Sequence, residues 1–532
     1  MNVAEQVVAR LVAEGVEVVF TVPGEQLDPL FGALARSGIR VVHARHEQGA
    51  ALMAYGYARS TSRIAVYTVI SGPGVLNSAV GLSTAYAGDA RVVCLAGQLP
   101  TGLLDRELGV PHEMPDQLGV LRTLTGWAAR VEKPDGVAGV LDEAFHRLHH
   151  RRPRPLAIEI PADVLGAEVA APESWLPPPL PEPPAAEAIE TARAALAGAR
   201  TPIIFVGSGA RAAVAEVTEL AELLRAPVTT ELGGRGIVSD DHELSIALPV
   251  AHRLWPQADV VLAVGTRLYR PQVEWGVDGL QVIRVDLDEA EINRVAAPAV
   301  ALVGDAAPTL RALVDGLSPV PDRQHWWAEV AEARRSVDAE LAKLTPQVDF
   351  LHAIRRALPD DGFFVDEMTQ VGYVARLMFP VRQPATYVLP TYHGALGFGF
   401  ATSLGVKIAH PDRAVVSISG DGGFLFTAAE LATAVQHGIG VVAVIFNDNS
   451  FTNVERSQRK FMPTTVATAL RNPDFVRLAE AFGAVGVRAH DPDELCAEIA
   501  QAFTRPHTPT VIEVPIGETA NPWPWIRLPR VR

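Results

Sequence analysis

Two acidic residues near the C-terminal end of this 532-residue chain are spaced for shared chemistry. Asp421 lies in Gly420-Asp421-Gly422-Gly423, and Asp448 follows 27 positions later in Asn447-Asp448-Asn449. Two carboxylates, a loop carbonyl and phosphate oxygens together make the octahedral oxygen set that Mg²⁺ prefers. An isolated Gly-Asp-Gly is usually only an exposed turn, so the spacing and the segment between the two acids decide the interpretation.

That intervening segment predicts one β-loop-α-β unit. Residues 414–418 are a short apolar strand, residues 427–437 carry helical periodicity that a glycine ends, and residues 441–446 are a second buried strand. In a parallel unit both loops open at the carboxyl edge of the sheet, where ligands of α/β proteins bind. Residues 420–423 are then a turn whose N–H groups face a phosphate. The sequence therefore predicts a metal-diphosphate site.

A third acidic residue, Glu47, stands where a predicted strand gives way to a helix rich in small residues, in the segment VHARHEQGAALMAYGYAR at 42–59. On physical grounds alone, Glu47 need only favour the positive N-terminal end of that helix. A glycine-rich loop, SGPGVLN at 71–77, follows another predicted strand at 64–70. These two segments are independent of the first motif.

Residues 420–449, GDGGFLFTAAELATAVQHGIGVVAVIFNDN, resemble the diphosphate motif of the thiamine-diphosphate enzymes of the acetolactate synthase, pyruvate decarboxylase and benzoylformate decarboxylase superfamily. The resemblance implies an α/β fold with three Rossmann-like domains and parallel sheets. It also implies that Asp421, Asp448 and the backbone carbonyl of Ser450 bind Mg²⁺. Asp448 stands where many relatives have Asn.

The resemblance extends along nearly the whole chain. Residues 46–59 resemble the segment in which an acid hydrogen-bonds the pyrimidine N1′ of the cofactor, which gives Glu47 the activating role. The loop 71–77 is similar to the loop beside the pyrimidine. A segment starting at Gly394 is similar to the cofactor support, with the Gly394 carbonyl accepting from N4′ and Leu396 wedged between the two rings; without the family, Leu396 is one more core leucine. The implied cofactor-binding residues are Pro23, Glu47, Gly72, Pro73, Asn77, Gly394, Leu396, Gly420, Asp421, Gly422, Gly423 and Asp448.

Besides Glu47, five polar residues are candidate catalytic groups: Glu25, His112, Glu113, His393 and Asn453. Glu25 follows Pro-Gly, as an acid does in pyruvate decarboxylases, and could relay protons. His112 and Glu113 fall where relatives place substrate-facing side chains, although two solvated loop residues would look the same. His393 directly precedes the cofactor support, and a histidine of near-neutral pKa can move protons at a developing alkoxide. The competing interpretation is that His393 is a structural histidine whose ring is hydrogen-bonded to the backbone of a turn.

The chain departs from the decarboxylating branches around the expected reaction centre. The pair of adjacent histidines of pyruvate decarboxylases aligns near Asp105-Arg106-Glu107, where this chain has no such pair. The glutamate that those enzymes carry near the C-terminal end aligns with Val454, and in this respect the chain is similar to acetolactate synthase. The histidine of benzoylformate decarboxylase falls at Ile70. We therefore expect decarboxylation of a 2-oxo acid followed by ligation of the intermediate to a second carbonyl compound. The alternatives are a simple decarboxylase that releases an aldehyde and, less favoured, a non-catalytic paralogue.

Length and composition predict several domains, because 532 residues with 48% apolar side chains suffice for more than one core. Proline-rich joints occur at 171–184 and 318–322. They divide the chain into a pyrimidine-binding domain at 1–170, a central Rossmann-like domain at 186–318, and a diphosphate- and Mg²⁺-binding domain at 345–532. In this family the first and last domains of different subunits face each other, so the resemblance implies a homodimer or homotetramer with shared sites.

The net charge of −15 and the lack of a basic cluster argue against nucleic acid or an anionic membrane as partner. The first residues read as an amphipathic helix and not as a signal peptide, and no apolar run reaches the length of a membrane span. Cys94 and Cys496 are the only cysteines, which supports neither a disulfide framework nor a thiolate metal site. We expect a cytoplasmic protein whose partners are small molecules.

The central segment contains part of a dinucleotide fingerprint. Gly207 and Gly209 follow a predicted strand, but the third glycine is replaced by Ala212. Some members of the superfamily, including acetolactate synthases, bind FAD in this domain. Because the fingerprint is incomplete, we expect thiamine diphosphate and Mg²⁺ as cofactors and do not favour FAD.

Overall fold

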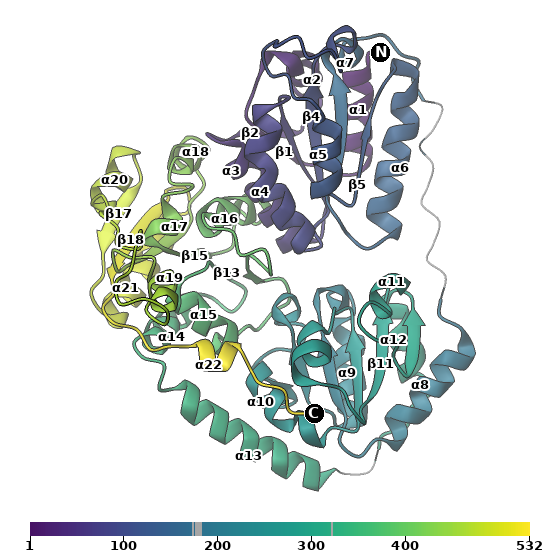
Figure 1. Ribbon diagram of the computed structural model, residues 1–532, viewed down its shortest axis with the longest axis vertical. Coiled ribbons are helices and arrows are strands. Elements are labelled where there is room, and N and C mark those ends of the chain that lie inside the picture. Colours follow the sequence, from purple (N-terminus) through teal and green to yellow (C-terminus); the bar gives the residue numbers. More distant parts are fainter. Residues whose placement is uncertain (173–174, 176–182, 321–322) are drawn as a thin grey trace.

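The computed structural model describes residues 1–172, 175, 183–320 and 323–532. Within these residues the chain forms three six-stranded sheets, one after another along the sequence, and every strand pairs in parallel with its neighbours (Figure 1). The predicted α/β fold with three Rossmann-like units is confirmed. Most of the first proline-rich joint and residues 321–322 of the second lie outside the described residues.

The N-terminal sheet has the strand order β2-β1-β3-β4-β6-β5. Thr21, the last residue of β1, pairs with His43 at the end of β2 and with Thr68 in β3. The loops after these strands therefore open at one edge of the sheet. Its strands are β1 (Val18–Thr21), β2 (Arg40–His43), β3 (Ala65–Val69), β4 (Val92–Gln98), β5 (Trp127–Arg130) and β6 (Leu156–Pro161). Its helices are α1 (Val3–Ala13), α2 (Asp28–Leu34), α3 (Glu47–Thr61), α4 (Pro73–Ala87), α5 (Gln117–Leu124), α6 (Val137–His150) and α7 (Ala162–Leu165).

The middle sheet has the order β12-β11-β10-β7-β8-β9. Its strands are β7 (Ile203–Val206), β8 (Val228–Thr230), β9 (Ser245–Ile246), β10 (Val260–Val264), β11 (Gln281–Asp286) and β12 (Val300–Val303). Its helices are α8 (Ala186–Gly198), α9 (Val214–Leu224), α10 (Leu248–Leu254), α11 (Glu289–Ile292) and α12 (Ala306–Val314). The long helix α13 (Gln324–Leu341) leads from this unit to the next and packs through Trp326 and Val330 into a shared core.

The C-terminal sheet has the order β14-β13-β15-β16-β18-β17. Gly420 at the end of β15 pairs with Phe446 near the end of β16, so the loops that carry the two aspartates open at the same edge. Its strands are β13 (Phe363–Val365), β14 (Tyr387–Val388), β15 (Val415–Gly420), β16 (Val442–Asn447), β17 (Val485–Arg488) and β18 (Thr510–Pro515). Its helices are α14 (Gln347–Ala357), α15 (Gln370–Met378), α16 (Phe398–Ala409), α17 (Asp421–Phe424), α18 (Glu430–Gln436), α19 (Thr452–Gln458), α20 (Phe475–Ala481), α21 (Pro492–Phe503) and α22 (Trp523–Ile526).

One prediction about this unit was wrong. The sequence predicts a turn at residues 420–423, but Gly420 ends β15 and Asp421–Phe424 form a short helix, α17. A Cβ atom on Gly422 would overlap the ring of Phe451, and one on Gly423 would overlap the carboxylate of Glu367. Close packing therefore requires glycine at both positions, whatever binds in front of them.

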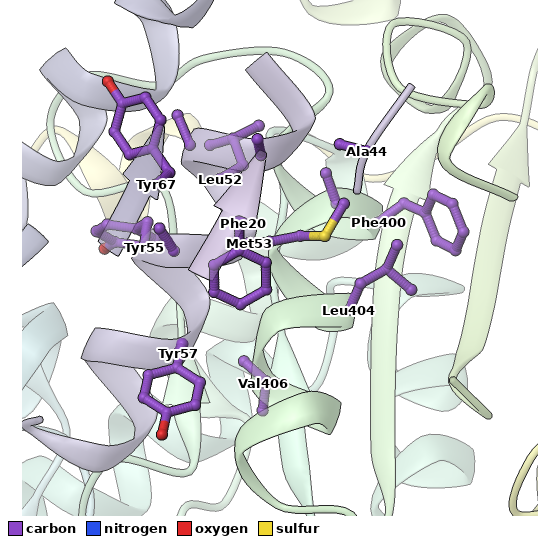
Figure 2. Packing of buried hydrophobic residues seen from close by; sticks show 14 of the residues in the cluster. Phe20, Ala44, Leu52, Met53, Tyr55, Tyr57, Tyr67, Phe400, Leu404 and Val406 are labelled. Atoms are coloured by element: carbon purple, nitrogen blue, oxygen red, sulfur yellow. The ribbon is translucent and has the colours of Figure 1, made fainter. Parts of the chain in front are cut away.

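Helices α3 and α16 join the N-terminal and C-terminal units. The buried side chain of Met53 in α3 packs against Phe400 and Leu404 of α16 (Figure 2). The helices approach so closely that a Cβ on Gly405 would overlap the Met53 carbonyl. This contact holds α3, which begins at Glu47, against the C-terminal unit.

Among the residues that the structure describes, no helix combines the length and apolar composition needed to cross a membrane. Cys94 is buried in β4 and Cys496 lies half-buried in α21, and both are free thiols. Burial raises the pKa of the Cys94 thiol to about 12, so this cysteine stays protonated at neutral pH.

Candidate functional site

Asp421 and Asp448 lie at the carboxyl edge of the C-terminal sheet, near enough for the charge of one to act on the other. Asp421 is only 3% exposed and accepts hydrogen bonds from its neighbour Gly422 (2.8 Å) and from the Asn472 amide (2.6 Å). Asp448 accepts from the Ser450 N–H (3.1 Å) and from the hydroxyl of Thr452. Burial raises the pKa of both aspartates, and the charge of Asp448 adds to the rise at Asp421.

This donor set fits a hard divalent cation. Carboxylate and carbonyl oxygens are the ligands that Mg²⁺ prefers, and a cation would offset the repulsion between two partly buried acids. Within the described chain, no group of three or more His, Cys, Asp or Glu side chains is arranged to hold a metal. The two aspartates would therefore share the ion with backbone and phosphate oxygens. Asp421 is itself the first residue of the short helix α17, and the start of a helix favours anions such as a diphosphate.

Glu47 lies at the first position of α3 and is only 9% exposed. Its carboxylate accepts a hydrogen bond from the Asn77 amide on α4 (3.0 Å). The structure thus brings together two residues that the sequence assigned to cofactor binding. The turn before Glu47 is held from the C-terminal unit, because the buried carboxylate of Glu430 accepts from the N–H groups of Arg45 (3.2 Å) and His46 (3.0 Å).

A buried polar chain holds the loop at 71–77. The N–H of Gly72 donates to the Gln117 side chain (2.7 Å), and Gln117 donates in turn to Glu159 (3.0 Å). Gly72 has φ = 60°, and a Cβ there would lie 2.6 Å from the carbonyl oxygen of His112. Glycine is therefore required by both conformation and space. Pro73 begins α4 and is exposed.

Pro23 and Glu25 are exposed at the same sheet edge. Gly24 between them lies directly on Ile70, and the neighbouring Gln26 accepts hydrogen bonds from the N–H (3.1 Å) and the hydroxyl (2.9 Å) of Ser71. The loop that carries Glu25 is thus adjacent to the loop at 71–77, as the prediction of a common site requires.

The remaining catalytic candidates differ in how they are held. The exposed His112 has φ = 66°, and its backbone covers Gly72. The Glu113 carboxylate accepts from the N–H groups of Leu108 (3.1 Å), Gly109 (2.6 Å) and Val110 (3.1 Å). Residual burial opposes its charge, but these donors hold the pKa of Glu113 below its ordinary value. Glu113 is therefore engaged in shaping its own loop.

His393 lies between the N-terminal and C-terminal units. Its Nε2 is 2.9 Å from the hydroxyl of Ser83 on α4, and partial burial lowers the pKa of the imidazole. The following Gly394 has φ = 63°. Leu396 is half-buried, and its carbonyl lies 3.5 Å from the side-chain nitrogen of Gln48, the residue after Glu47. A single chain thus places the start of α3 next to its own support loop.

Sequence reasoning missed three buried or half-buried residues of this site: Glu367, Glu430 and Asn472. Asn472 donates to Asp421 and to the Asn447 side chain (3.1 Å), which joins the loop after β15 to the loop after β16. Glu367 follows β13 at the carboxyl edge of the sheet, and that position was a readable signal. The partners of Glu430 and Asn472 are distant in sequence, so no local pattern marks them.

The cleft between the N-terminal and middle units contains a cavity of about 190 Å³, lined in part by Gly209, Asp286 and Arg211. Gly207 and Gly209 pack directly on Gly265, since a Cβ on either would overlap that residue. These glycines therefore have a packing role independent of any ligand.

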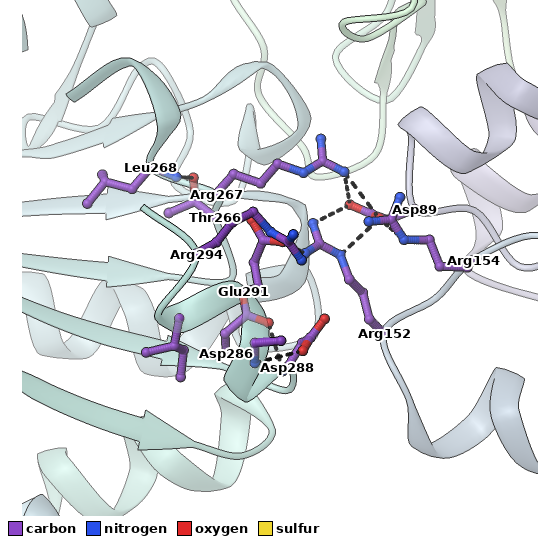
Figure 3. Close-up of polar contacts among 12 residues, drawn as sticks. Asp89, Arg152, Arg154, Thr266, Arg267, Leu268, Asp286, Asp288, Glu291 and Arg294 are labelled. Carbon is purple, nitrogen blue, oxygen red and sulfur yellow. Dashed lines mark hydrogen bonds and ion pairs between the residues drawn. The ribbon is translucent and has the colours of Figure 1, made fainter. Parts of the chain in front are cut away.

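Ion pairs link the N-terminal and middle units beside this cavity (Figure 3). Asp89 contacts Arg152 (3.0 Å), Arg154 (3.3 Å) and the middle unit's Arg267 (3.1 Å). Arg152 also reaches Glu291 of α11 (2.6 Å). The network fastens the N-terminal unit to the middle one.

Comparison with known protein families matches three consecutive segments. Residues 1–120 match the N-terminal TPP binding domain of thiamine pyrophosphate enzymes, residues 189–313 the central domain, and residues 367–514 the C-terminal TPP binding domain.

The chain is also similar to curated proteins over most of its length. It is 35% identical to a probable 2-ketoarginine decarboxylase of Pseudomonas aeruginosa over 517 residues, which cover 94% of this chain and 92% of that protein. It is 30% identical to the acetolactate synthase large subunit of Haemophilus influenzae, with 98% and 95% covered. An acetolactate synthase of Mycobacterium bovis is 31% identical, with 98% and 89% covered.

Proposed function

The chain belongs to the thiamine pyrophosphate enzyme family, and from that premise we propose that it decarboxylates a 2-oxo acid and ligates the remaining carbon unit to a second carbonyl compound. When bound, thiamine diphosphate supplies the nucleophilic carbon and the electron sink for the loss of CO₂. The protein supplies binding, orientation and proton control. Its relatives are named as enzymes, so the hypothesis of a non-catalytic paralogue has no support.

Asp421, Asp448 and the Ser450 carbonyl would hold Mg²⁺ against the diphosphate. Their support is the oxygen donor set at one sheet edge, with Asn472 fixing the Asp421 carboxylate. Glu47 would hold a proton shared with the pyrimidine N1′, and the Asn77 amide orients its carboxylate.

Ligation is favoured over simple protonation by the side chains that α19 presents after the metal loop. Val454 is apolar and 48% exposed, and the Asn453 side chain accepts from the Trp523 indole (2.7 Å). Glu455 is engaged with the Ser450 hydroxyl (2.8 Å) and with Arg459. This helix therefore offers no unengaged acid to protonate the intermediate, which supports capture by a carbonyl acceptor.

A decarboxylase that releases an aldehyde is the second candidate, favoured by the similarity to the probable 2-ketoarginine decarboxylase. Mass spectrometry of products separates the two. The wild-type protein with thiamine diphosphate and Mg²⁺ would be given a panel of 2-oxo acids, including one with a guanidinium group, with and without aldehyde or 2-oxo acid acceptors. Coupled hydroxy-ketone or hydroxy-oxo-acid products support ligation, and aldehyde alone supports the second candidate. No CO₂ release from any substrate contradicts both.

We also propose that the protein assembles as a homodimer or homotetramer with shared sites. Large apolar side chains are exposed on α4 and around the cofactor loops, and such surface is commonly covered by a partner. They are Leu76, Val80, Tyr392, Leu425, Phe426 and Phe461. The cytoplasm is the compartment we propose, supported by the two free thiols.

A further inference from the structure

A carboxylate outside the residues assigned above connects the cofactor loops with one another. Glu367 is fully buried after β13. One of its oxygens accepts from the Gly397 N–H (2.7 Å), and the other accepts from the Gly399 N–H (3.0 Å) and the Ser419 hydroxyl (2.6 Å). Its partners thus belong to two different elements, the start of α16 and the end of β15.

Each segment leads into a proposed cofactor contact. Gly397 immediately follows the support loop that begins at Gly394 and is the N-cap of α16, with φ = 75° and no side chain to cap the helix. The Glu367 carboxylate takes over this capping, and the positive end of α16 favours its charge. Ser419 stands two residues before Asp421 in β15.

The buried surroundings of Glu367 disfavour the charged form of its carboxylate. In the described part of the chain no arginine, lysine or histidine pairs with it, and burial raises its pKa to about 7. The neighbouring Asp366 is paired with Arg376 instead (2.8 Å). The energetic penalty of burying this carboxylate has to be offset by its interactions. Its three hydrogen bonds indicate that it holds the start of α16 and the end of β15 together.

We infer that Glu367 is a positioning residue that fixes the pyrimidine support loop relative to the Asp421 loop and so prepares the site for thiamine diphosphate. The inference rests on the proposed assignment of those two loops. Without the carboxylate, the start of α16 and the end of β15 lose their common anchor. The cofactor would then have to order both loops when it binds, which weakens binding.

The test compares Glu367→Gln with Glu291→Gln, the same substitution at a buried glutamate of the middle unit. Thiamine diphosphate affinity is measured at fixed Mg²⁺ by calorimetry, and apo-protein stability by thermal unfolding. An amide can face the three donors with only one acceptor oxygen, so the Kd of Glu367→Gln should rise roughly tenfold to a hundredfold. Its unfolding temperature should change no more than that of Glu291→Gln, whose Kd should stay at the wild-type value.

A wild-type Kd in Glu367→Gln would overturn the inference, as would an equal rise in Glu291→Gln. If Glu367→Gln does not fold, Ser419→Ala decides, because it removes one of the three hydrogen bonds. Its Kd should rise roughly threefold without loss of stability, and an unchanged Kd contradicts the positioning role. Failure of the wild-type protein to bind thiamine diphosphate would instead refute the proposed function.

Discussion

Two buried glutamates, one in the C-terminal unit and one in the middle unit, are held in opposite ways. Glu291 contacts Arg152 (2.6 Å) and Arg294 (2.9 Å), whereas the donors to Glu367 among the described residues are all neutral. Burial opposes the charge of both. At Glu291 the two arginines overcome burial and lower the pKa, while the pKa of Glu367 rises to about 7.

The difference shows that similar sheets can be used for different purposes. In the middle unit, charges beside the sheet edge neutralise one another and fasten two domains together. In the C-terminal unit, Glu367, Asp421 and Asp448 lie at the edge and form no ion pair within the described residues; under the proposed function a metal would supply the missing positive charge. Function therefore depends on the side chains at the edge and not on the Rossmann-like fold itself.

The largest effect is expected from removing Asp421, a proposed ligand of Mg²⁺. Asp421→Ala should abolish detectable binding of thiamine diphosphate with Mg²⁺ and lower activity by at least about 10³-fold, roughly 4 kcal/mol, since the diphosphate charge loses its counter-ion. The matched control is Asp286→Ala, at the end of β11 in the middle sheet. Calorimetry should find wild-type cofactor affinity in that control. Equal affinities in the two variants would show that the carboxyl edges of the middle and C-terminal sheets do not differ in cofactor binding.

The next largest effect is expected at Glu47. Glu47→Gln should still bind cofactor, but C2 proton exchange followed by NMR should slow by roughly 10²–10⁴-fold, because an amide cannot hold the N1′ proton. Normal exchange would move the activating role to another residue.

Mixing this variant with Asp421→Ala tests whether sites are shared. If Glu47 and Asp421 of different subunits meet, a mixed dimer contains one intact site and activity returns. If each chain builds its own site, as the proximity of Gln48 to Leu396 within one chain allows, every site stays damaged. Heterodimers that form but remain inactive would show that each chain builds its own site.

The sequence predicted the fold well where local patterns determine it. Apolar runs placed the strands observed as Val415–Gly420 and Val442–Asn447 to within a few residues. The prediction from sequence was wrong at residues 420–423, because their glycines suggested a turn where the chain forms the short helix α17. Only the tertiary contacts of Phe451 and Glu367 reveal that these glycines are needed for packing.

The candidate site was predictable only in part for the same reason. Asp421, Asp448 and Glu47 stand in local motifs at strand ends. The partners that hold them are far away in the chain: Asn472 reaches Asp421, and Glu430 reaches the turn before Glu47. Such pairings follow from how whole domains pack, and a linear pattern does not contain them.

A smaller expected effect is the opposite pH dependence of the stability that Glu367 and Glu291 contribute. The pKa of Glu367 is about 7 in the folded protein against an ordinary value of 4.5. Its stabilising contribution is therefore fully present below about pH 4.5 and is lost as the pH rises through 7. Glu291 has a lowered pKa, so its contribution is present above 4.5 and is lost as the pH falls through the folded value.

Apo-protein unfolding temperatures from pH 4 to pH 8 test this contrast. Relative to wild type, Glu367→Gln should gain stability as the pH rises, and Glu291→Gln should gain stability as the pH falls. Because a multidomain protein need not unfold in one step, the comparison uses apparent temperatures at one scan rate. Parallel pH profiles for the two variants would show that the two carboxylates are held alike.

The smallest expected effect is the absence of a response to flavin. The cavity beside the middle sheet measures about 190 Å³, below the roughly 300–1,000 Å³ typical of ligand pockets, and its glycine fingerprint ends in Ala212. Purified protein should be colourless, and added FAD should leave the unfolding temperature unchanged. Thiamine diphosphate with Mg²⁺ at 100 times its Kd should stabilise the same sample by about 2.7 kcal/mol. A flavin absorption band in the purified protein, or stabilisation by FAD, would show that the middle edge also binds a cofactor and that the contrast between the two edges is wrong.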